Sequence, residues 1–87
     1  MPVIGKFQNL NKELGIPDED VAYEAKWRAV KALKDLIVEI KSAIGKANWL
    51  EAAILKPLLL DANSTLERWQ VLYEAQAEEL DRHYYSA

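Results

Sequence analysis

The sequence has no cysteine, one histidine, and only three glycines and three prolines among its 87 residues. Without cysteine, neither a disulfide scaffold nor a thiolate metal site can form. Because so few glycines and prolines interrupt the chain, long regular elements are expected. The glycines, at positions 5, 15 and 45, also lack the spacing of a phosphate-binding loop.

Catalytic groups are equally scarce. The only serines are Ser42, Ser64 and Ser86, and the one histidine, His83, lies near a chain end of the kind that frays. Glu79 and His83 are four residues apart, but two ligands fall short of a metal site and a solvated helix end explains them. We therefore expect no enzymatic activity, no metal and no cofactor.

The chain also lacks a long apolar run. Its most apolar stretch, residues 49–60, contains Glu51, Lys56 and Pro57 and is too short to span a bilayer. The first 15 residues lack the apolar core of a secretory signal, so a cytoplasmic protein without a membrane segment is expected. With 51% apolar and 29% charged residues, the chain has the composition of one folded domain, residues 1–87.

Residues 17–45 are predicted to form a long amphipathic helix. Pro17 suits the first helical position, the acidic residues 18–20 suit the positive end of the helix dipole, and Gly45 suits the end. Apolar residues recur at steps of three and four: Val30, Leu33, Ile37, Ile40 and Ile44, backed by Ala29, Leu36 and Ala43. Two ion pairs with a spacing of four residues are expected on the exposed side: Glu24–Arg28 and Lys31–Asp35.

A second helix is predicted over residues 49–84. Asn48 and Glu51 have the spacing of a capping box, which restarts a helix at Trp49. One apolar stripe continues in phase along the segment: Leu55, Leu58, Ala62, Leu66, Trp69, Tyr73, Ala77, Leu80 and Tyr84. The favoured fold is therefore an all-α antiparallel hairpin whose second helix is kinked at Pro57. The alternative is a three-helix bundle, because Ser64 and Glu67 form a second capping-box match where a third helix could start.

Residues 1–16 are interpreted as an N-terminal arm with one short helical turn. Its apolar residues are Phe7, Leu10 and Leu14, with Asn9 as a candidate N-cap and Gly15 as a stop. The segment from residue 50 to 60 is apolar around nearly its whole circumference, which two or three helices cannot easily enclose. We therefore predict a self-association interface at Leu55, Leu58, Leu59 and Leu60. Alternatively, the arm folds over this segment through Phe7 and Leu10 and completes a monomeric core.

A second candidate surface lies beside the core stripe of the first helix. Trp27, Lys31, Lys34, Val38 and Lys41 follow steps of four and three, and could bind an acidic partner, a phosphate-bearing ligand or single-stranded nucleic acid. Alternatively, the lysine stems only cover a tryptophan at the edge of the core.

Charge is distributed unevenly along the chain. Residues 21–60 carry seven basic and four acidic groups (+3), whereas residues 61–87 carry two basic and six acidic groups (−4). The acidic residues of the second helix follow one side: Glu67, Glu74, Glu78 and Asp81. They form a solvated face, meet the lysine stripe of a neighbouring subunit, or mimic a nucleic-acid backbone.

These features favour a non-enzymatic protein–protein interaction or assembly module: a helical homo-oligomer that scaffolds or regulates an unidentified protein partner. One alternative is a small-ligand or nucleotide-binding protein that uses the Trp27–Lys31–Lys34 stripe. Another is a stand-alone antagonist such as an antitoxin, an immunity protein or a viral inhibitor. A pI of about 5.1 argues against nucleic acid as a partner, because phosphate attraction dominates such binding.

Overall fold

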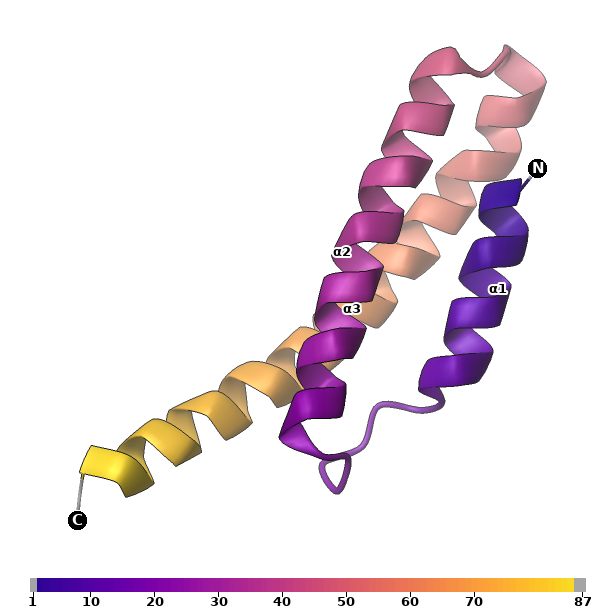
Figure 1. Ribbon diagram of the computed structural model, residues 1–87. Helices are drawn as coiled ribbons and strands as arrows, with labels where there is room; N and C mark the ends of the chain where they lie inside the picture. The colour runs from indigo at the N-terminus through magenta and orange to yellow at the C-terminus, as the bar shows by residue number, and fades with distance from the viewer. Residues whose placement is uncertain (1, 86–87) are drawn as a thin grey trace.

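A computed structural model describes the backbone of residues 2–85 and the side chains of residues 3–82, and this part of the chain contains three helices and no strand. They are α1 (Pro2–Leu14), α2 (Tyr23–Lys46) and α3 (Trp49–Tyr85). Figure 1 shows α2 and α3 as an antiparallel hairpin with α1 packed alongside. The predicted all-α hairpin is confirmed. The third helix is the N-terminal arm and not a C-terminal fragment.

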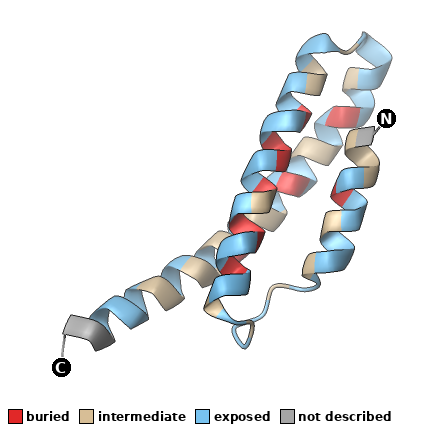
Figure 2. Cartoon of the chain, viewed as in Figure 1, coloured by how far each residue is buried: buried red, intermediate tan, exposed pale blue. Residues whose placement is uncertain are grey.

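The core lies where α2 faces α3 and α1. In Figure 2 the buried residues gather on the facing sides of α2 and α3. The largest cluster consists of Phe7, Ala29, Val30, Leu33, Leu36, Ile37, Ile40, Ala62 and Trp69. Most of its members belong to the two stripes expected from the sequence, because a period of 3.6 residues places them on one face of each helix. The indole nitrogen of Trp69 has no hydrogen-bond partner among the residues described.

The N-terminal arm is more ordered than its short apolar pattern predicted. It forms a 13-residue helix that starts at Pro2, so Asn9 lies in the helix interior and is not an N-cap. Proline suits a first helical turn, where its missing N–H would have no partner. Phe7 is buried in the core, as the monomeric alternative expected. Gly15 ends the helix as predicted: its φ is 72° and its N–H donates to the carbonyl of Asn11 at 3.0 Å.

The predicted start of α2 was wrong, whereas its end at Lys46 lies one residue from the predicted limit. The helix starts at Tyr23 and not near Pro17, because the acidic residues fold into a turn in which the Asp18 carboxylate accepts a bond from the Asp20 N–H at 3.1 Å. At the other end Gly45 stays helical. Ala47 ends the helix in an extended conformation, and its N–H donates to Ile44 at 3.2 Å.

The predicted Asn48–Glu51 pair closes the turn between α2 and α3, although Glu51 accepts its bond from the Asn48 side-chain amide and not from the Asn48 backbone N–H of a complete capping box. The Glu51 N–H donates to Asn48 Oδ1 at 2.9 Å, and Asn48 Nδ2 donates to Glu51 Oε1 at 3.1 Å. Two residues therefore suffice to reverse the chain.

No break follows in α3, which runs unbroken through Pro57 to Tyr85. Pro57 and Ala53, whose carbonyl loses its helical partner, are both exposed, and water can replace the missing bond. The second capping-box match does not start a helix. Instead, the Thr65 hydroxyl donates to the Asp61 carbonyl at 2.9 Å within α3.

The molecule is elongated because α3 is longer than α1 and α2. At 1.5 Å per residue its 37 residues span about 55 Å, and the longest dimension of the chain is 56 Å. The radius of gyration is 15.4 Å, against about 12 Å expected for a compact chain of this length. The end of α3 projects past the start of α2 as a single helix (Figure 1). We call residues 77–82, the part of this end with described side chains, the overhang.

Candidate interaction surfaces

The first candidate surface lies at the closed end of the hairpin, on the first three turns of α3. Four large apolar side chains are exposed there: Trp49 at 82%, Leu50 at 56%, Ile54 at 48% and Leu60 at 68%. Ala53 and Pro57 are exposed between them, since steps of three and four residues share one side of a helix. We call these six residues the tip face. It is a contiguous apolar surface of the kind that marks an interface.

The predicted self-association residues lie on different sides of α3. Leu55 is buried within the single chain, at 1% exposure, and Leu58 and Leu59 are half-buried against the core. Leu60 alone points to solvent. The segment is apolar around nearly its whole circumference, but its two sides differ in burial. The chain covers one side of the helix and leaves the other exposed to solvent.

The second candidate surface surrounds Trp27, near the open end of the hairpin. A shallow hollow of about 280 Å³ is lined by Trp27, Val30, Lys31, Lys34, Asp35 and Tyr73. Trp27 is 45% exposed, and Lys31 Nζ lies 5.4 Å from the centre of a Trp27 ring, within cation–π range. We call this the Trp27 hollow. The fold thus brings Tyr73 of α3 to three of the five predicted stripe residues, Trp27, Lys31 and Lys34.

The remaining stripe residues lie outside the hollow. Lys41 and Val38 are exposed farther along α2 and do not line it. The predicted Glu24–Arg28 ion pair is present at 3.2 Å. The predicted Lys31–Asp35 pair is absent from the described ion pairs, because Lys31 covers the indole of Trp27 instead.

A tyrosine pair closes the open end of the hairpin beside the hollow. The rings of Tyr23 and Tyr73 stack with centroids 5.2 Å apart and an interplanar angle of 18°. The Tyr23 hydroxyl donates to the Tyr73 hydroxyl at 3.3 Å. This hydrogen bond, followed by burial and the charges of Tyr73 and Asp81, raises the pKa of Tyr23 above its ordinary value of 10.0. The pair therefore favours the neutral phenol at this position.

Lys26 is a polar core residue that the sequence interpretation missed. It is 2% exposed, and its Nζ donates to the Glu19 carbonyl at 2.9 Å and to Gln76 Oε1 at 2.6 Å. One side chain therefore joins the 15–22 linker, α2 and α3. A signal was present, because Lys26 lies four residues before Val30 and seven before Leu33, in phase with the core stripe.

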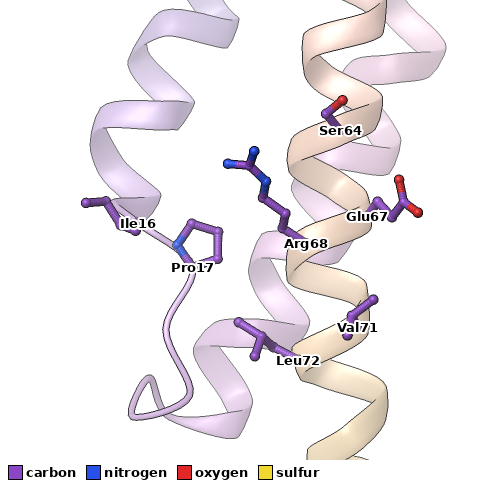
Figure 3. Close-up of a pocket in the computed structure, with 7 residues that line it drawn as sticks. All are labelled: Ile16, Pro17, Ser64, Glu67, Arg68, Val71 and Leu72. Atoms are coloured by element: carbon purple, nitrogen blue, oxygen red, sulfur yellow. The ribbon is translucent and has the colours of Figure 1, made fainter.

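A wider groove runs between the 15–17 linker and α3 (Figure 3). Its volume is about 590 Å³, and its lining combines apolar and charged side chains: Ile16, Pro17, Ser64, Glu67, Arg68, Val71 and Leu72. In Figure 3, Arg68 and Leu72 extend from α3 toward the linker. This lining holds no histidine or cysteine.

The acidic residues of α3 are exposed along its C-terminal half. Glu78 pairs with Arg82 at 3.5 Å, and Glu74 accepts a bond from Gln70 Nε2 at 3.3 Å. Leu80 continues the core stripe into the overhang but is 48% exposed, because this part of α3 extends beyond Tyr23, where α2 begins. The predicted stripe residue Tyr84, and the His83 side chain, lie outside the described side chains.

Residues 3–82 contain no group of three or more potential metal ligands. None of the helices, over the residues described, combines the length and apolarity needed to cross a membrane. Comparisons with protein-family models, curated proteins and solved structures found no match to this chain.

Proposed function

We propose that this protein is a non-enzymatic assembly module that associates with a second copy of itself through the tip face. The observation that carries the proposal is the exposure of Trp49, Leu50 and Leu60 on one side of α3. Apolar burial is the main driving force of association, and aromatic residues are enriched at the centres of interfaces.

The surface area of the chain supports this proposal. One chain exposes 6384 Å², whereas a compact monomer of its mass exposes about 5,200 Å². The excess is about 1,200 Å², and a standard interface removes about 800 Å² from each partner. The isolated chain therefore has enough surplus surface for one interface of ordinary size.

The charges around the tip face favour a second copy as the occupant. Its rim carries two lysines, Lys46 and Lys56, and two carboxylates, Glu51 and Asp61, all of them exposed. A two-fold contact brings identical faces together, so a face with a strong net charge would repel itself. Here the rim charges balance, and apolar contact faces no net repulsion.

The proposal is tested by the mass of the protein in solution. At concentrations on the order of tens of micromolar, wild type should sediment as a particle larger than the 9.9 kDa chain. Leu60→Glu places a charge in the desolvated contact and should weaken association about tenfold or more. Circular dichroism should show unchanged helix content, because Leu60 contributes little to the core.

Val38→Glu is the matched control, since Val38 is 66% exposed and Leu60 68%. Val38 lies on α2, away from the tip face, so this variant should assemble as wild type does. A wild-type protein that remains a 9.9 kDa monomer would refute the proposal. An equal loss of assembly in both variants would show that added charge, and not the tip face, is responsible.

A further inference from the structure

The overhang is an amphipathic helix end whose apolar residue Leu80 is left half exposed by the described part of the chain. The last described side-chain bonds between α2 and α3 are made by Tyr73 and Gln76. Beyond them Leu80 is half exposed, and its neighbours Glu78, Glu79, Asp81 and Arg82 give a net charge of −2. An apolar stripe that continues in phase past the end of its partner retains a face suited to burial.

The Trp27 hollow has the complementary character. It offers an exposed indole, with Lys31 and Lys34 on its lining against a single carboxylate, Asp35. A half-exposed leucine flanked by carboxylates fits such a surface. The leucine can cover the indole, and the carboxylates can reach the two ammonium groups.

The two surfaces are close together in one chain, because Tyr73 lines the hollow and precedes the overhang by one helical turn. From Tyr73 to Asp81 the helix rises about 12 Å. Two overhangs can run antiparallel about a two-fold axis. The C-terminal end of each overhang then reaches Tyr73 of the other chain, where the partner's hollow lies.

We propose that the overhang of one copy docks into the Trp27 hollow of a second copy, and that the exchange is reciprocal. Leu80 then covers Trp27, while Glu79 and Asp81, which flank Leu80 on the helix, face Lys31 and Lys34. This inference rests on the proposed function in that copies assemble, but it uses the opposite end of the molecule from the tip face. Two separate contacts on one rod lead to particles of more than two chains.

The test is a charge exchange measured by sedimentation, both in the wild-type chain and in the Leu60→Glu chain, where the tip contact is removed. Lys31→Glu with Lys34→Glu should weaken the remaining association about tenfold or more, and Glu79→Lys with Asp81→Lys should do the same. All four substitutions together should restore it, because both sides of the contact have changed sign. Added salt should weaken the wild-type contact as well.

Lys12→Glu with Lys41→Glu is the matched control. Both lysines are exposed, both lie outside the hollow, and the change in net charge is the same. This control should assemble like its parent chain. If it loses as much association as the hollow variant, or if the four-fold exchange fails to restore assembly, the inference is overturned.

The hollow could instead bind a small anion, and the same set of variants separates this outcome. ATP is added while tryptophan fluorescence and sedimentation are followed. A fluorescence response that needs Lys31 and Lys34, with masses that ignore both charge pairs, overturns the inference and assigns the hollow to a phosphate-bearing ligand. If Leu60→Glu weakens association and the charge-pair variants do not, the tip-face proposal is supported and the overhang proposal is overturned. If the charge-pair variants weaken association and Leu60→Glu does not, the overhang proposal is supported and the tip-face proposal is overturned.

Discussion

The two ends of the hairpin are held together in different ways. At the tip, the chain reverses in two residues, and bonds between Asn48 and Glu51 close the turn. At the open end, α2 and α3 are joined by side chains 50 residues apart in sequence, Tyr23 with Tyr73 and Lys26 with Gln76, and Lys26 also holds Glu19 of the linker. Local bonds at the tip leave its apolar side chains free to face outward. At the open end, the long-range bonds are made by polar groups that are partly buried.

The largest effect is expected from placing charge on the inner side of α3 near the tip. Leu55→Glu puts a carboxylate at a site with 1% exposure and should cost about 4 kcal/mol or more, a large share of the stability of a small domain. Leu60→Glu, five residues later and 68% exposed, should change the melting temperature little. Thermal melts followed by circular dichroism compare the two. Similar melts would contradict the separation of the inner and outer sides of α3.

A smaller effect is expected from the buried lysine at the base. Lys26→Ala leaves the Glu19 carbonyl and Gln76 Oε1 without their donor and should cost about 2 kcal/mol in the free energy of unfolding. Lys26→Met keeps the aliphatic volume and should lose less. Urea unfolding provides the measurement, with Lys41→Ala as an exposed control outside the hollow that should stay within about 0.5 kcal/mol of wild type. A neutral Lys26→Ala would mean that the linker is held by other contacts.

The smallest effect concerns pH. Because the folded state raises the pKa of Tyr23, the tyrosine pair stabilises the fold below the unfolded value of 10.0, and this contribution is lost as pH rises through the folded pKa. An NMR titration of the Tyr23 ring measures the shift. Tyr73→Phe removes the hydrogen bond and should lower the Tyr23 pKa, whereas Asp81→Asn removes the last and smallest cause and should lower it less. The opposite order would place Tyr23 closer to Asp81 than to Tyr73 in solution.

Helix content and pairing were predictable because they depend on patterns within a few turns of chain. The stripe from Val30 to Ile40 and the Asn48–Glu51 pair carry their information locally, and both were confirmed. Helix limits were less predictable. Asp18 can begin a helix or close a turn with nearly the same local chemistry, and Gly45 can end a helix or continue one.

The candidate surfaces show the same limit. The stripe of Trp27, Lys31 and Lys34 could be read from its spacing, but Tyr73 joins it only because α3 returns alongside α2. Leu55 and Leu60 look alike in sequence and differ only in which side of the helix the chain covers. Lys26 looks like an exposed lysine unless its phase with Val30 is followed.

By itself, the sequence determined that the chain is helical, where it reverses at Asn48, and which faces of its helices are apolar. These properties follow from side-chain chemistry and from a repeat of 3.6 residues, which act over a few turns of chain. Only the tertiary structure decided which apolar faces are covered. That outcome depends on the relative lengths of α1, α2 and α3, because a face is buried only where a second helix extends beside it. Leu80 lies beyond the start of α2 and is therefore half exposed, although it lies on the same side of α3 as the buried Trp69.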